Sequence, residues 1–592
     1  MRRPPPVSSA VPAAAVLVFA AAFCWSAGQR GFFALDQSIP FDAGWRVLDG
    51  QVPFRDFVLP VGPVVPWVVS GGLRLFGADF AGYLATACAL NVLAAALAMM
   101  VTARLLPGRR APWLLAGVLT GIWFQGPVGT PWFEPLALLA ALPGLGFWAC
   151  TVAQPSSPRL RAGAGAAAGA SFAVTFLAKQ NGILAAAPAA CLLLALEGRV
   201  HGWRAAGRRT LWVAAGGLGI GALFVGWLAL VPAAPSQPAP LRAFVLHVLE
   251  IPGGLPPARF LGKPWELARI PWAGAGPPAP SLVLAGLASV SALVLLGRLA
   301  RPAGSSATAG PSGRIRDRTA AAGALGAGLF YGGNLLALTT RNQPETAFGL
   351  SGLVVALGLA VAADGFHALT GGQSPRPVRL ARFTLAGVAV AVIAWRGAEV
   401  SLARTVHEGV ARAERYEAME VPSLRPLQWA VPTALREATV ERATLERLLR
   451  SLKGRPGEVF VFPDWTILYG LLGRPSPQPL LWFHPGLTYP RDDGPVRRAL
   501  DRRLVASLAD RGVETVVLER TSWLGTAARL ADFPLLRGYL ERCFAPEEVV
   551  GLFEVRSRRG GCTPEPPGTY STTSMSSTSK VRGPAGLPSS PA

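Results

Sequence analysis

The chain has 592 residues, of which 51% are hydrophobic and only 15% are charged. Soluble domains carry about 25% charged residues, so this composition excludes an ordinary soluble protein and indicates a polytopic membrane protein. The formal net charge is +22, but the arginines lie in short loops between apolar segments, where they orient helices in a bilayer. There is no basic stripe interleaved with stacking aromatic residues, so we predict no nucleic-acid partner.

Apolar segments long enough to cross a bilayer recur over residues 1–400. A spanning helix needs about 20 mostly apolar residues, and we expect the first one to be an uncleaved helix rather than a signal peptide. In total we expect about eleven spans, over residues 11–28, 78–106, 113–125, 132–152, 162–178, 182–196, 210–231, 281–297, 319–339, 346–363 and 383–400. Residues 60–76 are interrupted by prolines and glycines, and we interpret them as an amphipathic or re-entrant segment at the outer interface.

The loops between these spans alternate in charge. Every loop assigned to the inside is rich in arginine, whereas the outward loops carry fewer basic residues over a greater length. The positive-inside rule therefore places the N-terminus in the cytoplasm and everything after residue 400 outside.

The pattern changes after residue 400. Short β-rich runs alternate with helical segments, which predicts a small extracytoplasmic α/β domain over 401–562 with a largely parallel sheet. The expected strands are 458–462, 513–518 and 549–555, and the expected helices are 434–452, 498–510 and 530–542. Residues 563–592 are Ser, Thr, Pro and Gly with almost nothing to bury, and we expect a disordered tail.

The outward loop after the first span, within 29–77, concentrates charged residues. Residues 35–57 hold Asp36, Asp42, Asp49, Asp56, Arg46 and Arg55. We interpret this stretch as a loop that carries the active site. Asp36 lies at or just outside the end of the first helix, so it is either a carboxylate in headgroup water or a functional group. Apolar neighbours would raise its pKa and suit it to act as a general base near neutral pH.

The stretch from Asp36 through GWRVLDGQVPFRDF to LPVGPVV and LRLFG resembles the first external loop of the GT-C superfamily. More narrowly, it resembles the bacterial family-39-like transferases related to protein mannosyltransferases and lipid A aminoarabinose transferases. In those proteins an acidic pair follows the first helix, and G-x-x-P-[YF]-x-D-F comes next. Asp36 matches the first acid and Gln37 stands where the second often is. Gly50, Pro53, Phe54, Asp56 and Phe57 fit the later pattern.

The resemblance implies an inverting membrane glycosyltransferase in a bacterial-type plasma (inner) membrane. Its donor would be a sugar on a polyprenyl phosphate, and its acceptor a hydroxyl of a lipid or glycan that Asp36 deprotonates. We expect no cofactor and leave the metal requirement open, although neither the cysteine spacing nor the scattered histidines form a metal motif.

Such chemistry needs cations for the leaving phosphate on the outer side. The candidates are Lys179 in a very short hairpin, Arg341 and Arg55, with Gln180 and Asp56 beside them. An arginine fork can hold a phosphate by two hydrogen bonds, but each cation could equally be a snorkelling interface residue. Glu134 could bind a sugar hydroxyl or be interfacial, and the long outer loop adds His247 and Glu250 as further candidates.

Two other functions compete with the enzyme. A transporter or flippase for a lipid-linked saccharide predicts ionisable groups at mid-membrane on broken helices, whereas the charges here gather on one side. A non-catalytic membrane scaffold would use the outer α/β domain, and Gln37 in place of a second acid fits it.

Cys543 and Cys562 are the only cysteines predicted to lie outside the membrane. Disulfides persist in that compartment, and Gly560 and Gly561 would let the chain bend back. The alternatives are one bridge or two free thiols.

Overall fold

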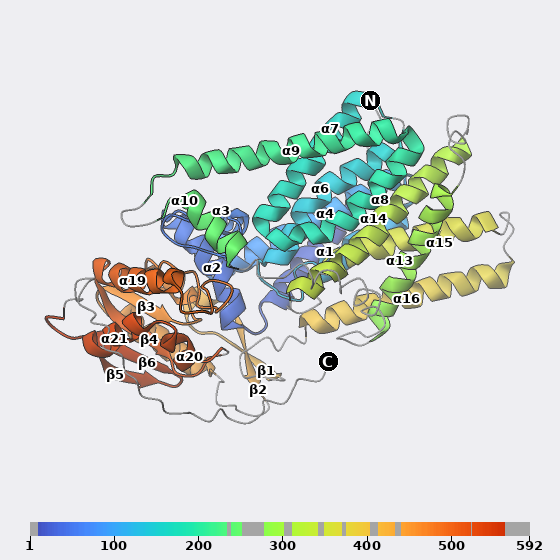
Figure 1. Ribbon diagram of the computed structural model, residues 1–592. Coiled ribbons are helices and arrows are strands. Elements are labelled where there is room, and N and C mark those ends of the chain that lie inside the picture. Colours follow the sequence, from blue (N-terminus) through green and yellow to red (C-terminus); the bar gives the residue numbers. More distant parts are fainter. Residues whose placement is uncertain are drawn as a thin grey trace, which may run out of the picture.

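The structure is a computed structural model (Figure 1) and describes residues 10–154, 156–233, 238–251, 278–300, 311–340, 349–369, 375–402, 413–432, 440–522 and 524–562. A bundle of long helices leads into a small α/β domain at one end (Figure 1). The predicted fold class, mainly helical and polytopic with a C-terminal α/β domain, is confirmed. The predicted tail 563–592 lies outside the described residues.

Within the described ranges, a helix occupies each predicted span. These helices are α1 (Ala10–Gly28), α4 (Phe80–Leu105), α5 (Arg110–Trp123), α6 (Phe133–Ala153), α7 (Pro158–Ala178), α8 (Ile183–His201), α9 (Trp203–Leu230), α13 (Pro278–Leu299), α14 (Pro311–Thr340), α15 (Ser351–Leu369) and α16 (Arg376–Leu402). Of the helices in the described ranges, 8 are long and apolar enough to cross a membrane by length and composition. α5, with 14 residues, is short for a span of its own.

Two helices on the outside of the bundle show how it meets lipid. α9 exposes Leu211, Leu218 and Leu223, and α16 exposes Phe383 and Trp395. Large apolar side chains in such numbers on a soluble protein would mark an interaction surface. On helices of this length they are the surface that hydrocarbon chains cover.

At one end of the bundle, the first connecting segment folds into α2 (Ala34–Leu48) and α3 (Val64–Phe76). The prediction of a loop over 35–57 is therefore wrong for its first half. Its charged residues indicated a loop, but Asp42 and Arg46 pair across one helical turn at 2.9 Å and are fully buried. α3 packs so close to α2 that a Cβ added at Gly44 would lie 2.4 Å from Val69 Cγ1.

The C-terminal domain is built on a four-stranded sheet with strand order β3-β4-β6-β5. Its strands are β3 (Glu458–Phe462), β4 (Val513–Glu519), β5 (Phe544–Val550) and β6 (Phe553–Arg558). Its helices are α17 (Arg442–Lys453), α18 (Ile467–Leu472), α19 (Pro495–Asp510), α20 (Thr526–Ala531) and α21 (Pro534–Cys543). A separate hairpin, β1 (Ala413–Ala418) and β2 (Gln428–Pro432), precedes the sheet, with the short turn η5 (Pro422–Leu424) between its strands.

Two predictions about this sheet are wrong. Only β3 and β4 run parallel, whereas β4–β6 and β5–β6 are antiparallel. The single strand expected over 549–555 is a hairpin, because the chain reverses at Gly551, whose φ is +57°. Glycine adopts that left-handed conformation without steric cost, and residues on both sides of it continue as strands. The helix expected over 530–542 begins instead in α20 and resumes in α21 after Phe533.

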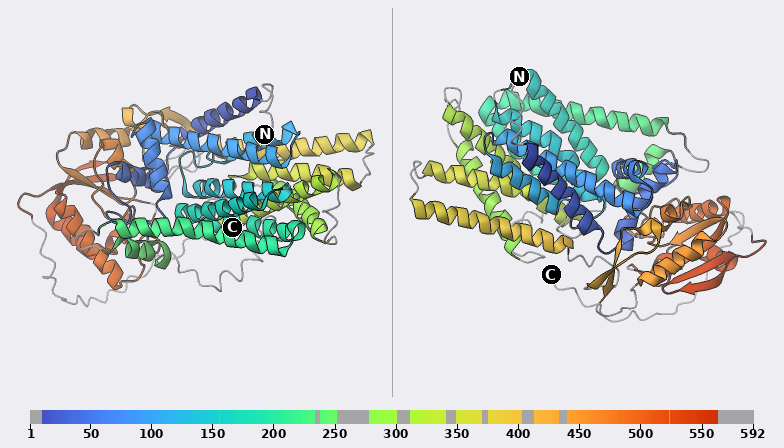
Figure 2. Two further views of the ribbon diagram at one scale, coloured as in Figure 1. Left: turned by 90° about the horizontal axis from the view of Figure 1, so that it is seen from above. Right: turned by 180° about the vertical axis from the view of Figure 1, so that it is seen from behind.

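The α/β domain and the helices α2 and α3 share one hydrophobic core. Phe41, Phe57 and Val65 belong to the same buried cluster as Phe460 and Leu480. A backbone bridge joins Val58 to Leu480. In both views of Figure 2 the domain lies at the end of the bundle where α2 and α3 lie. We call this end of the bundle, with α2, α3, the turn at Lys179 and the α/β domain, the domain face.

Candidate active site

Asp36 lies in the first turn of α2 and is half-buried. Burial, followed by the negative charge of Glu134, raises the pKa of its carboxyl group from 3.8 to about 7. Lys179 lowers this pKa and Asp464 raises it further. The position at the start of a helix favours the charged form, so the buried surroundings outweigh it. Within the described part of the chain, this carboxylate has no hydrogen-bond partner, which leaves its oxygens available for a substrate.

Glu134 and Lys179 form an ion pair beside Asp36. Glu134 begins α6 and is completely buried, whereas Lys179 caps the end of α7 and its side chain is 13% exposed. Lys179 therefore faces the protein interior rather than lipid. Its charge and that of Glu134 both act on Asp36, so three of the residues singled out from the sequence meet at the domain face.

The α/β domain adds an acid that the sequence analysis did not select. Asp464 follows β3 and is held by Arg529 of α20 through two hydrogen bonds of 2.5 Å and 2.7 Å. Both side chains are buried, and the charge of Asp464 acts on Asp36. The available signal was the Pro-Asp pair directly after a predicted strand. It could not be used because nothing local in the sequence indicates that this strand end meets α2.

Aromatic rings close the space between α2 and the domain. Phe32 lies 5.7 Å from Trp465 and 6.4 Å from Trp429, measured between ring centroids, and the two indoles are 6.2 Å apart. All three rings are buried. They fix the loop after β3, and with it Asp464, against the start of α2.

Gln37 is committed to a structural contact. Its amide nitrogen donates to the carbonyl oxygen of Val128 at 3.0 Å and to Thr130 Oγ1 at 3.4 Å. Its amide oxygen accepts from the backbone N–H of Phe33 at 2.7 Å. Gln37 thus joins the first outer segment to the second. The acid whose negative charge acts most strongly on Asp36 is Glu134.

The other predicted donor ligands that the structure describes, Arg55, Asp56 and Gln180, form hydrogen bonds with groups other than Asp36. Arg55 and Asp56 pair with each other at 2.7 Å, and Asp56 also accepts from the backbone N–H of Val52. Gln180, in the short helix η2 (Gln180–Gly182), donates to the carbonyl oxygens of Pro60 and Val248. Arg341 lies outside the described residues.

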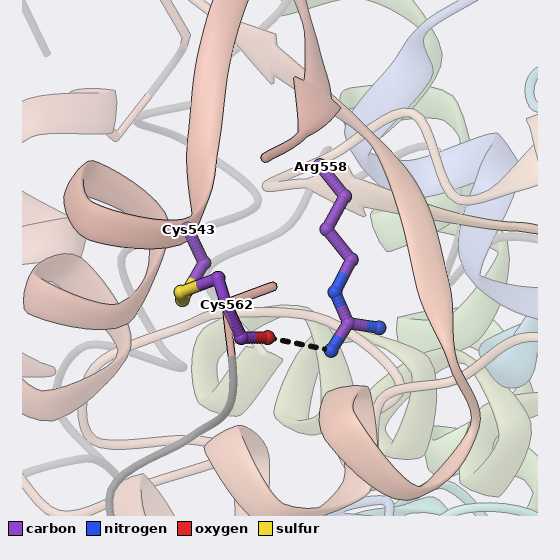
Figure 3. Close-up of a disulfide and its surroundings, with 3 residues drawn as sticks. All are labelled: Cys543, Arg558 and Cys562. Carbon is purple, nitrogen blue, oxygen red and sulfur yellow. Dashed lines mark hydrogen bonds between the residues drawn. A yellow bond between two sulfur atoms is a disulfide. The ribbon is translucent and has the colours of Figure 1, made fainter. Parts of the chain in front are cut away.

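Cys543 and Cys562 are joined by a disulfide, with their Cα atoms 5.4 Å apart (Figure 3). The carbonyl oxygen of Cys562 accepts a hydrogen bond of 3.0 Å from Arg558 (Figure 3). The bridge ties the end of α21 to the segment after β6. It lies within the α/β domain and contributes no group to the surroundings of Asp36.

The charges of Glu134 and Asp464 both act on Asp36. Among the described residues, no group of three His, Cys, Asp or Glu side chains could hold a metal ion. The arrangement instead pairs one carboxylate of raised pKa with a neighbouring cation. Such a pair can accept a proton from one group and stabilise negative charge on another.

No protein-family model and no curated protein matches the sequence. The similar proteins that comparison finds are solved structures. The chain is similar to the oligosaccharyltransferase of Archaeoglobus fulgidus in complex with zinc and sulfate. The TM-score is 0.47 at 13% identity, covering 92% of this chain and 73% of that one. It is also similar to ArnT from Cupriavidus metallidurans bound to undecaprenyl phosphate, with a TM-score of 0.43 at 14% identity, covering 93% and 99%. The apo form of ArnT gives 0.40 at 16% identity, covering 92% and 97%.

Proposed function

We propose that this protein is a membrane glycosyltransferase of GT-C type that moves a sugar from a polyprenyl-phosphate donor to an acceptor hydroxyl at the domain face. One observation carries the proposal: Asp36 is half-buried beside a Lys–Glu pair and has a pKa of about 7. A carboxyl group with a pKa near the working pH suits general-base catalysis. The resemblance of the first outer loop to GT-C transferases supplies the reaction class.

In the proposed step, the acceptor hydroxyl gives its proton to the Asp36 carboxylate. The acceptor oxygen forms a bond to C1 of the donor sugar, and the bond between C1 and the phosphate oxygen breaks. The electron pair of that bond leaves with the polyprenyl phosphate. Because attack and departure occur on opposite faces of C1, the transfer inverts the anomeric configuration.

Lys179 is the proposed cation for the departing phosphate. It is the described cation whose charge acts on Asp36 most strongly, and its side chain is held at the domain face by Glu134. A fixed cation aimed at developing negative charge stabilises a transition state more than a mobile one. Glu134 orients Lys179 and, through its own charge, keeps the pKa of Asp36 high.

A transporter of lipid-linked saccharides fits the described helices less well. In α4, α6, α8 and α9 the charged residues lie near the helix ends, as Arg104, Glu134, Glu197 and Arg209 show. Glu197 and Arg209 are buried and pair at 2.9 Å. A transport pathway would place ionisable groups near the middle of the membrane.

The test uses the full-length protein in liposomes with undecaprenyl phosphates that each carry one hexose. We expect at least one donor to be consumed in the presence of a lipid or glycan acceptor, with release of undecaprenyl phosphate. Movement of intact glycolipid between leaflets without its cleavage would support the transporter instead. Neither cleavage nor movement with any donor would support the scaffold.

A further inference from the structure

Three buried hydrogen-bond acceptors at the domain face have no protein partner among the described residues. They are Gln180 Oε1, Asn181 Oδ1 and His247 Nδ1. A buried polar atom without a partner costs about 1–3 kcal/mol, and native structures hold few of them. Gln180 and Asn181 directly follow Lys179, and His247 lies in the turn that Gln180 contacts. This grouping indicates a place where a ligand supplies the missing hydrogen-bond donors.

The orientation of Gln180 is fixed by its other amide atom. Nε2 donates to the carbonyl oxygen of Pro60 at 2.9 Å and to that of Val248 at 3.4 Å. Oε1 must therefore be the atom without a partner, and it can only accept. The bond to Val248 also places the amide of Gln180 against the turn of η3 (Val245–Glu250) that carries His247, just after α10 (Pro240–Phe244).

His247 is only 4% exposed. Burial, followed by the positive charge of Arg503, lowers the pKa of its imidazole to about 4, while the backbone of Thr488 opposes this shift. The ring is therefore neutral at pH 7, and one of its nitrogens is an acceptor. Since Thr488 and Arg503 belong to the α/β domain, His247 lies where the outer helix η3 meets that domain.

The surrounding charges decide the chemical class of the ligand. An acceptor can be satisfied by a neutral O–H or N–H group or by a cation such as an ammonium group. The guanidinium of Arg503 acts on His247, and Lys179 directly precedes Gln180, so a second cation would be repelled here. Neutral donors remain, and on the sugar of the proposed donor these are chiefly hydroxyl groups.

We propose that Gln180 Oε1 and His247 Nδ1 form a subsite that accepts hydrogen bonds from hydroxyl groups of the donor sugar. The inference rests on the proposed function, in which Lys179 holds the donor phosphate. The sugar is bonded to that phosphate through C1, so its ring hydroxyls must reach residues next to Lys179. Gln180 follows Lys179 in the chain, and Gln180 contacts the turn of His247.

Two substitutions separate recognition from packing at His247. His247→Phe keeps the ring shape and volume of the buried side chain but removes the acceptor. His247→Asn loses volume but keeps an acceptor near the position of Nδ1. Arg242→Gln serves as the control on the same outer segment, because Arg242 is exposed and pairs only with Glu250 among the described residues.

Binding is measured on the full-length protein carrying Asp36→Asn, which prevents turnover, with two probes: undecaprenyl phosphate, and undecaprenyl phosphate bearing glucose, mannose or galactose. We expect His247→Phe to weaken the glycosylated lipid about tenfold, equivalent to about 1.4 kcal/mol, and to leave the plain lipid unchanged. His247→Asn and Arg242→Gln should stay within about threefold of the parent for both.

Equal affinity of His247→Phe and the parent for the glycosylated lipid would overturn the subsite, because a water molecule would then suffice at Nδ1. A loss in His247→Asn as large as that in His247→Phe would also overturn it, as would an equal loss for both lipids. In each of these cases the parent still binds the glycosylated lipid and the proposed function stands. A parent protein that binds neither lipid would overturn both.

Discussion

The raised pKa of Asp36 suits it to act as a general base but lowers the stability of the folded protein at neutral pH. Its folded-state pKa of about 7 lies above the ordinary value of 3.8, so the folded protein holds this proton more tightly than the unfolded chain. The contribution of this proton to the free energy of unfolding is fully present below the ordinary pKa of 3.8, and it is lost as the pH rises through about 7. Shifted pKa values of this kind cluster at functional sites, which supports the proposed role of Asp36.

This linkage predicts that Asp36→Asn stabilises the protein at high pH. The amide is neutral at every pH and keeps the shape of the side chain. At pH 8 the variant should melt at a higher temperature than the parent, and at pH 5 the difference should be smaller, because the carboxyl group is then protonated in the folded protein but still mostly ionised in the unfolded chain, whose pKa is 3.8. Thermal unfolding in one detergent at both pH values checks this. A variant that is less stable than the parent at pH 8 contradicts the raised pKa.

The same pKa sets the pH dependence of the proposed transfer. The base acts only when deprotonated, so the rate in the parent should rise as the pH passes through about 7 and level off above it. The measurement is the initial rate under saturating donor between pH 5.5 and 8.5. A rate that falls over this range would assign the catalytic proton to an acid instead of a base.

Substitutions at Lys179 and Glu134 should separate an effect on stability from an effect on donor binding. Lys179→Gln leaves Glu134 buried without its cation, which costs about 3–5 kcal/mol. The double variant Glu134→Gln and Lys179→Gln removes both charges and should recover most of that stability. It should not recover affinity for undecaprenyl phosphate, because the phosphate has lost its cation.

The control is Lys453→Gln, since Lys453 is exposed at the end of α17. It should change neither quantity. A double variant that binds the lipid phosphate as tightly as the parent would show that Lys179 serves only to neutralise Glu134.

At the scale of elements, α2 is held to the α/β domain by a buried polar network. Arg46 pairs with Asp42 at 2.9 Å and donates to the carbonyl oxygens of Gln478 and Leu480. Ser476 donates to the other oxygen of Asp42 at 2.5 Å. Burial raises the pKa of Asp42, although Arg46 and Ser476 oppose that shift. The network therefore fixes the helix that carries Asp36 against the domain that carries Asp464.

Arg46→Met should destabilise the protein by about 3–5 kcal/mol, because it leaves Asp42 buried and uncompensated. Adding Asp42→Asn should restore part of this loss. We also expect the single variant to become sensitive to protease between α2 and the domain. Arg415→Gln, at an exposed arginine of β1, is the control. An unchanged melting temperature in Arg46→Met would mean that this network does not hold the two parts together.

The elements differ in how far the sequence could predict them. The local hydrophobic pattern is enough to predict the spans of 20 apolar residues and the strands β3 and β4. α2 did not, because the partners that bury Asp42 and Arg46 come from residues 476–480, more than 400 positions away. Glu134, Lys179 and Asp36 could be named from charge in apolar surroundings. Asp464 could not, since its nearness to Asp36 depends on how the whole domain docks.

For the whole molecule, the predicted topology places the domain face outside the cytoplasm. The disulfide Cys543–Cys562 belongs in such an oxidising compartment and should contribute about 3 kcal/mol at this spacing. In intact cells, a membrane-impermeant maleimide should label neither cysteine before reduction and both after reduction by an impermeant phosphine. Labelling only after the cells are broken would place the α/β domain in the cytoplasm.

The central claim is that Asp36 removes the acceptor proton during sugar transfer at the domain face. Its most direct test compares the parent and Asp36→Asn in liposomes, with the glycosylated undecaprenyl phosphate that the parent consumes, under single-turnover conditions. We expect transfer by Asp36→Asn to be slower by roughly 100-fold or more, in the range that general bases supply, while donor binding is retained. Transfer by Asp36→Asn at the parent rate would contradict the claim.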